Sequence, residues 1–150
     1  MTTLSRFSAG VAFVAAVSAS AHAQAPKFST MPGPIKRPFS SAVIVNGMIY
    51  LSGQIGADTT GKLAPGGIGP ETKQALENIR TELAKHGATM NDVVKCTVML
   101  ADIAEWAKMN DVYITFFPEH PPARSAFGTQ GLALGARVEI ECLAVAPPAK

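Results

Sequence analysis

The sequence predicts an α+β domain in which two helices pack on one face of a mixed β-sheet. Three observations favour it. Two apolar runs flank Asn46-Gly47, the dipeptide most typical of a type I′ hairpin turn. Apolar residues recur at helical spacing between Pro70 and Gly87. The last strand-like segment, 137–145, carries apolar residues on both of its faces, which predicts that an oligomer covers the second face.

The first 23 residues are predicted to be a cleaved secretory signal peptide. They carry one cation, Arg6, then an apolar run, then Ala21-His22-Ala23, which matches an A-x-A cleavage site. The apolar run 9–17 is shorter than the roughly 20 residues that a membrane span needs. An uncleaved anchor is the alternative. We expect an exported protein, periplasmic or secreted, that begins near Gln24 and has no stable membrane association.

The mature chain of about 127 residues is enough for one domain with a single core. The full sequence has 13 Lys and Arg against 11 Asp and Glu, a formal charge of +2. A charge so close to zero, without a basic cluster, gives no electrostatic case for a nucleic-acid partner. The two cysteines are far apart, and the mature chain keeps only two isolated histidines, His86 and His120, so no metal site is expected.

The remaining elements can be placed in order along the chain. The arm 24–38 is rich in proline and is expected to be irregular. The hairpin follows, and its second strand leads into Ser52-Gly53-Gln54, where the glycine allows a close approach of a ligand or another backbone. After a loop rich in glycine and proline, the pattern predicts a helix, a strand, a second helix and two strands: 70–86, 93–100, 103–117, 123–128 and 137–145.

Two features of the predicted core leave alternatives open. Cys96 and Cys142 each sit in an apolar strand-like run, where cysteine usually serves as a small buried hydrophobe, so we expect two unpaired thiols. A disulfide is the alternative in an oxidising compartment. The second helix carries a stripe that is typical of a face buried on a sheet, with a pocket lining as the alternative: Trp106, Met109, Tyr113, Phe116 and Phe117.

Arg124 is the strongest candidate for a binding residue. A guanidinium fixed on a strand is pre-shaped to hold a carboxylate through two parallel hydrogen bonds. Glu139, fifteen residues further on, is suited to position or deprotonate a water. On spacing alone, however, an arginine and a glutamate on neighbouring strands more often form a surface ion pair. Glu141 is expected to be a surface or subunit-contact charge.

The chain resembles the Rid family, the reactive intermediate deaminases also called YjgF, over nearly all of 39–145. The resemblance rests on four segments: Ser52-Gly53-Gln54-Ile55 after the Asn46-Gly47 hairpin, 74–79, Asn110-Asp111-Val112-Tyr113 with Phe116-Phe117, and Pro122-Ala123-Arg124-Ser125 followed by Val138-Glu139-Ile140-Glu141. It implies a chorismate-mutase-like domain over 39–146, with a tail at 147–150. It also implies a homotrimer with three ligand sites in the clefts between subunits.

The resemblance further implies hydrolysis of reactive 2-imino or enamino acids to 2-keto acids and ammonia, without a metal or cofactor. Arg124 then holds the substrate carboxylate, and Glu139 lies near the attacking water. Ser52 and Gly53 line the same cleft, Gly53 by its backbone amide. For Ser52, a hydroxyl that satisfies its own turn is equally expected. The chemistry agrees with this modest equipment, because an imine carbon is already electrophilic and positioning with one proton transfer suffices.

Two residues depart from the best-known imine deaminases of the family. Phe39 stands where they carry a tyrosine, and Ala126 stands where they carry a cysteine two residues after the arginine. Both changes leave the carboxylate anchor intact, so we hypothesise a shifted substrate preference at a site that Phe39 still lines. The alternative function is a trimeric module that binds small carboxylates and catalyses nothing. A ribonuclease activity draws no support from the nearly neutral surface.

Overall fold

The structure, a computed structural model, describes residues 25–30 and 37–148, so the predicted signal peptide lies outside the described residues. The strands and helices in chain order are β1 (Lys27–Ser29), β2 (Ala42–Val45), β3 (Met48–Leu51), β4 (Gln54–Ile55), α1 (Ile68–Lys85), β5 (Val93–Leu100), α2 (Trp106–Tyr113), β6 (Ala123–Gly128) and β7 (Val138–Val145). Short 3₁₀ turns occur at Met90–Asp92, Ile103–Glu105, Ile114–Phe116 and Ala133–Gly135.

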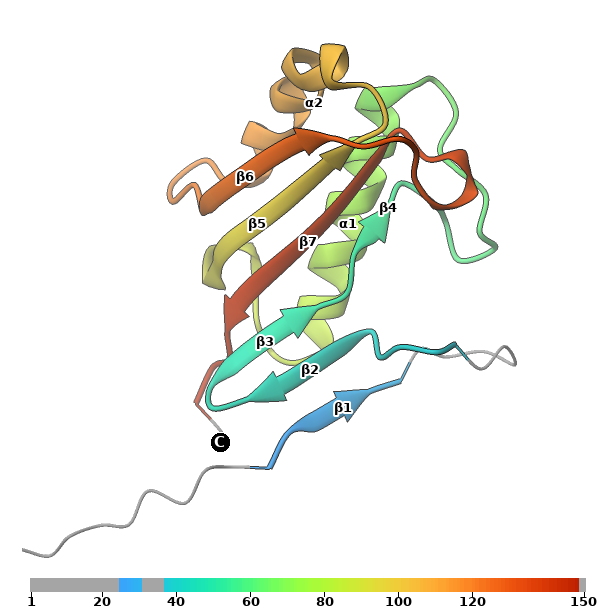
Figure 1. Ribbon diagram of the computed structural model, residues 1–150. Coiled ribbons are helices and arrows are strands. Elements are labelled where there is room, and N and C mark those ends of the chain that lie inside the picture. The colour runs from blue at the N-terminus through green and yellow to red at the C-terminus, as the bar shows by residue number, and fades with distance from the viewer. Residues whose placement is uncertain (1–24, 31–36, 149–150) are drawn as a thin grey trace, which may run out of the picture.

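The described strands form one mixed sheet in the order β1-β2-β3-β7-β5-β6, with β4 paired to β7. β5 and β6 run parallel, and α2 makes the crossover between them, while the other pairs are antiparallel. In Figure 1 both helices lie behind the sheet, with α1 crossing behind β7 and α2 near the ends of β5 and β6. The predicted α+β layer, with two helices on one face, is confirmed.

The first hairpin turns as the sequence predicts. Asn46 and Gly47 have φ values of 50° and 74°, the two positive angles that a type I′ turn requires. One neighbouring prediction is wrong: residues 27–29, expected within an irregular arm, form strand β1 and pair with β2. A segment of three residues is too short to show the alternation of a strand in the sequence. β1 becomes recognisable only in the structure, where it pairs with the outer strand of the hairpin, β2.

Helix α1 supplies the central part of the core. It begins at Ile68, two residues before the predicted start, and ends at Lys85, where Gly87 adopts a φ of 73° just beyond the end. Its apolar stripe is fully buried at Ala75, Leu76, Ile79 and Leu83. Burial of each large aliphatic side chain stabilises the fold by about 1.5–3 kcal/mol. This stripe fixes α1 against the sheet.

Helix α2 is shorter than predicted, because it ends at Tyr113 and a 3₁₀ turn carries the chain on to Phe116. Four members of the predicted stripe are buried in the core, as expected: Met109, Tyr113, Phe116 and Phe117. Trp106, the first residue of the helix, is 41% exposed. The stripe is therefore a core face along most of its length, with an accessible indole at its start.

The expectation of two free thiols is wrong, because Cys96 and Cys142 form a disulfide. They are direct cross-strand neighbours on β5 and β7, with Cα atoms 4.1 Å apart, and both are buried. Sequence shows that both runs are strands but does not show that they pair in this register. In the chain-entropy model, closing the 46-residue separation stabilises the fold by roughly 4 kcal/mol.

The sheet face away from the helices is open and partly apolar. Tyr50, Phe127 and Val145 lie on it and are 44%, 47% and 47% exposed. An exposed apolar sheet face agrees with the expectation that a second copy covers it, which remains a prediction. Among the helices within 25–30 and 37–148, none is long and apolar enough to cross a membrane.

Candidate functional site

The side chain of Arg124 is held by residues of helix α2. Its Nη1 donates a hydrogen bond to Asn110 Oδ1 at 2.6 Å. The guanidinium carbon lies 4.6 Å from the ring centre of Tyr113 and 5.6 Å from that of Trp106. Both distances are within the range of a cation–π attraction. The half-buried guanidinium is therefore fixed in position before any ligand arrives.

Helical geometry explains how α2 forms this cradle. Trp106, Asn110 and Tyr113 are spaced by four and then three residues, so they lie on one face of the helix. That face packs toward the edge strand β6, which carries Arg124. Asn110 was not among the site residues predicted from the sequence. Its spacing from the aromatic stripe was a visible signal, but only the crossover from β5 to β6 brings the helix to Arg124.

Tyr113 is the most unusual group in the cradle. Among the buried side-chain nitrogen and oxygen atoms of the described residues, its hydroxyl is the one without a hydrogen-bond partner. Burial raises the pKa of Tyr113 to about 12, against the smaller opposing effect of the Arg124 charge. The phenol is therefore neutral at ordinary pH, and its ring is the part that contacts Arg124.

Glu139 lies on β7, opposite Ile55 of β4, and its carboxylate covers Gly53. A β-carbon at position 53 would overlap Glu139 Oε1, so glycine is required for this close approach. The sequence predicted a close approach at Gly53, and the group that makes it is the side chain of Glu139. Ser52 donates its hydroxyl to the Ser40 carbonyl at 2.6 Å, so its proton is used within the chain.

The two residues that depart from the family lie in different parts of the chain. Phe39 is 50% exposed and immediately precedes Ser40, so it lies near the end of β3 with Ser52. Ala126 pairs with Val98 on β5 and packs against the core on the same face as Arg124. The predicted site residues therefore form two groups, one around Arg124 and one around Glu139.

Arg124 and Glu139 do not meet within one chain. Arg124 is opposite the buried Cys96 on β5, which places it on the helix-covered face. Glu139 lies between the buried residues Val138 and Ile140, so its side chain points to the open face. The register sets their Cα atoms two strands and three residues apart, about 14 Å at standard strand spacings. One small substrate therefore cannot contact both residues of a single chain.

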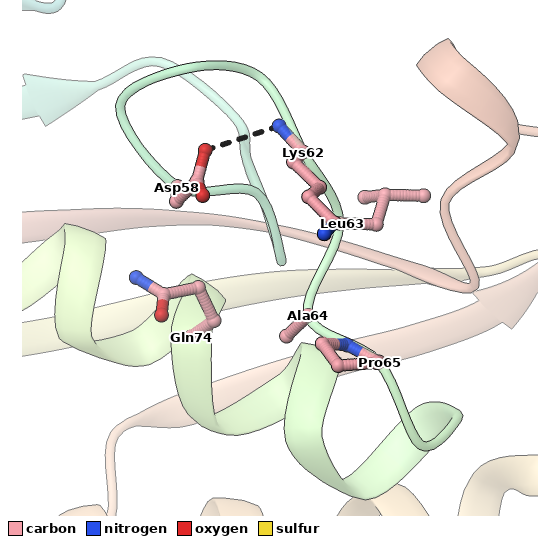
Figure 2. Close-up of a pocket in the computed structure, with 6 residues that line it drawn as sticks. All are labelled: Asp58, Lys62, Leu63, Ala64, Pro65 and Gln74. Atoms are coloured by element: carbon pink, nitrogen blue, oxygen red, sulfur yellow. Dashed lines mark hydrogen bonds between the residues drawn. The ribbon is translucent and has the colours of Figure 1, made fainter.

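A separate hollow of about 260 Å³ lies between the loop after β4 and helix α1. Figure 2 shows its lining, which includes Asp58, Lys62 and Gln74. Hydrogen bonds from the Thr60 side chain and from the backbone of Lys62 and Thr60 lower the pKa of Asp58. The Asp58 carboxylate is thus used to stabilise the loop that contains it. None of the predicted site residues lines this hollow, so it is not the candidate site.

Among the hydrogen bonds and ion pairs of the described residues, neither histidine contacts Arg124 or Glu139. His86 is the C-cap residue directly after helix α1, and its Nε2 is 3.2 Å from Ser29 Oγ and 3.5 Å from Glu82 Oε1. His120 is exposed in the connector before β6. Within the part of the chain that the structure describes, no group of three or more His, Cys, Asp or Glu is arranged to hold a metal ion.

The comparisons with known proteins identify the class. Residues 30–146 match the family described as Endoribonuclease L-PSP, and the chain belongs to this family, which is the Rid/YjgF family. It is 48% identical to the 2-iminobutanoate/2-iminopropanoate deaminase of Bos taurus over 74% of the chain and 82% of that protein. It is 44% identical to the human deaminase of the same name over 78% and 85%.

Solved structures agree with the family and the fold. The crystal structure of Escherichia coli TdcF with bound serine has a TM-score of 0.72 and 31% identity to this chain, over 81% of this chain and 99% of that one. The fold predicted from the sequence is therefore that of a Rid/YjgF protein.

Proposed function

We propose that this protein hydrolyses reactive 2-imino and enamino acids to 2-keto acids and ammonia. The identity of 44–48% to 2-iminobutanoate/2-iminopropanoate deaminases supports this activity. The observation that carries it is the pre-ordered guanidinium of Arg124. Of its five N–H donors, Asn110 uses one among the hydrogen bonds of the described residues, so the others remain for a carboxylate.

The proposed reaction needs one anchor and one base. Arg124 binds the carboxylate that every 2-imino acid carries, which sets the neighbouring imine carbon in a defined place. A water then adds to this carbon, and Glu139 accepts a proton from it. That proton passes to the imine nitrogen and gives a carbinolamine. When the remaining hydroxyl proton also moves to nitrogen, the C–N bond breaks and the keto acid and ammonia are released. Imine plus water equals these products, so no further reactant is needed.

We infer that a complete site requires two copies of the chain. One copy supplies Arg124, and its neighbour supplies Glu139 with Gly53, Ser52 and Phe39. Two features support this arrangement: the placement of Arg124 and Glu139 on opposite faces of one sheet, and the partly apolar open face that carries Glu139. A homotrimer, typical of the family, satisfies the requirement with three equivalent sites.

We also propose that the protein works after export, in the periplasm or outside the cell. The signal-peptide pattern of residues 1–23 supports export. The buried Cys96–Cys142 disulfide is a second support, because such bonds persist mainly in oxidising compartments. Cell fractionation with an antibody tests the location. A full-length product that stays in the cytosol would contradict it.

The activity is tested with imines generated in place by an L-amino-acid oxidase. Ammonia and keto-acid release is compared for the purified protein, its Arg124→Ala variant and a blank without protein. We expect an acceleration over spontaneous hydrolysis that the variant loses. A panel of amino acids then tests the preference proposed from Phe39 and Ala126. Rates on 2-aminoacrylate equal to those of a typical family deaminase would contradict a shifted preference.

The same assay separates the enzyme from a carboxylate-binding module. If no imine in the panel is hydrolysed faster than in the blank, the enzymatic proposal fails. A Glu139→Gln variant that loses turnover but keeps its affinity for 2-oxobutanoate would assign Glu139 to the chemical step. A Glu139→Gln variant with the wild-type rate would remove Glu139 from it.

A further inference from the structure

Asn110 is the polar residue of helix α2 that contacts the proposed carboxylate anchor. Its Oδ1 accepts from Arg124 Nη1 at 2.6 Å, within the short range of charge-assisted hydrogen bonds. The two aromatic rings of the cradle contact the guanidinium without directional hydrogen bonds. Rotation of the guanidinium in its own plane is therefore restrained by Asn110, whereas the rings restrain its tilt.

This restraint determines which edge of Arg124 faces a ligand. A guanidinium offers two edges for a bidentate contact, and the bond to Asn110 engages Nη1. Among the hydrogen bonds of residues 25–30 and 37–148, none engages the edge formed by Nε and Nη2, which leaves it for the two oxygens of a carboxylate. An unrestrained arginine side chain carries about 2 kcal/mol of rotamer entropy, part of which is lost when it binds. Fixing Arg124 in advance lowers that cost for the ligand.

We propose that Asn110 is a positioning residue for the deaminase reaction, and that it raises substrate affinity by holding the guanidinium of Arg124 with its Nε–Nη2 edge free. This inference rests on the proposed function, in which Arg124 binds the substrate carboxylate. Asn110 acts through Arg124 and does not touch the substrate. Its effect therefore falls on KM more than on kcat, and it disappears when Arg124 is absent.

A double-mutant cycle tests this dependence. In the imine assay, Asn110→Ala is expected to raise KM about tenfold, as for loss of a hydrogen bond to a charged group, with kcat changed less than about twofold. In the Arg124→Ala background, which has too little turnover for kinetic constants, the same substitution is expected to change the affinity for 2-oxobutanoate by less than about twofold. An equal loss in both backgrounds, or no loss in either, overturns the proposal.

Two controls exclude a general effect on the helix. Asp111 is the exposed next residue of α2, and Asp111→Ala is expected to leave KM unchanged. The melting temperature of Asn110→Ala is compared with that of the wild type. If the rise in KM is accompanied by a large fall in the melting temperature, or if Asp111→Ala raises KM equally, the role is structural and the proposal fails.

A binding measurement keeps this test separate from the proposed activity. Calorimetric titration with 2-oxobutanoate gives the affinity of the wild type, Arg124→Ala and Asn110→Ala without any turnover. If imines are not hydrolysed but the affinity falls in both variants, the enzymatic proposal fails while the positioning role stands. If the affinity falls in Arg124→Ala but not in Asn110→Ala, the positioning role fails while the anchor stands. If the wild type does not bind 2-oxobutanoate, the anchoring role of Arg124 and the positioning role of Asn110 both fail.

Discussion

The two groups of the proposed site differ in how firmly the chain holds them. Arg124 is bound by Asn110, lies against the rings of Tyr113 and Trp106, and is opposite the disulfide-bonded Cys96 on β5. Within the described residues, no hydrogen bond reaches the carboxylate of Glu139, which lies over Gly53.

This difference matches the two proposed roles. An anchor gains affinity from being fixed before the ligand binds. A group that takes a proton from water needs access to that water and some freedom to move. In the proposed site, the chain completes the binding half around Arg124 by itself, and a second copy closes the chemical half around Glu139.

Mixed assemblies test whether the two groups come from different copies. Arg124→Ala and Glu139→Gln are each expected to be nearly inactive alone. Co-expressed with different tags and assembled as mixed homotrimers, they are expected to recover about a third of the wild-type sites, because each mixed trimer has one pair of neighbours that supplies both native residues. The mixed species is purified through both tags, and its imine hydrolysis is measured.

The control for this experiment pairs Arg124→Ala with a chain that carries both substitutions. That mixture contains no Arg124 and is expected to stay inactive. If the first mixture also stays inactive although both tags are present in one assembly, a site shared between copies is contradicted.

Gly53 and Gly56 offer a matched pair for the Glu139 group. A methyl group at position 53 meets the flexible end of Glu139, so Gly53→Ala is expected to displace the carboxylate and lower kcat/KM about tenfold while the fold survives. A methyl group at position 56 lies 2.5 Å from the Cα and carbonyl oxygen of Glu71, which are backbone atoms of helix α1 and cannot rotate away as a side chain can. Gly56→Ala is therefore expected to cost about 1–3 kcal/mol of unfolding free energy.

Denaturant unfolding and the imine assay together separate the two glycine variants. Gly53→Ala is expected to shift activity more than stability, and Gly56→Ala the reverse. Full activity in a folded Gly53→Ala protein would show that the position of Glu139 over Gly53 does not matter for the reaction.

The sequence predicted those parts of the fold that local patterns control. The Asn46-Gly47 hairpin follows from backbone sterics, and helix α1 from the spacing of its apolar residues. It did not predict the Cys96–Cys142 bond or strand β1, because both depend on which distant segments pair and in which register.

The candidate site shows the same limit. Arg124 and Glu139 were identified from residue type and family resemblance, but their placement on opposite faces follows only from the strand register. Asn110 was visible as part of a motif, and its contact with Arg124 depends on the α2 crossover. Local chemistry thus indicates candidate residues, whereas the non-local pairing decides which of them act together.

Tyr113 allows the finest test of the Arg124 group. Its ring supports the guanidinium, but its buried hydroxyl has no partner. An unsatisfied buried hydroxyl does not stabilise the fold, so Tyr113→Phe is expected to leave the unfolding free energy unchanged or raise it by about 1 kcal/mol. KM is expected to stay within about twofold of the wild type, since the phenyl ring still contacts Arg124. Because the pKa of Tyr113 is raised to about 12, the pH dependence of activity below about pH 10 is also expected to be unchanged.

Tyr113→Leu is the matched variant, since it fills part of the same space but removes the aromatic face. It is expected to raise KM about three- to tenfold, the loss of a partly desolvated cation–π contact. KM values and unfolding free energies for the two variants show whether the ring or the hydroxyl of Tyr113 supports Arg124. If Tyr113→Phe raises KM as much as Tyr113→Leu, the hydroxyl has a partner in the assembled site. The binding half would then also be completed by the second copy, which would remove the contrast between the two groups.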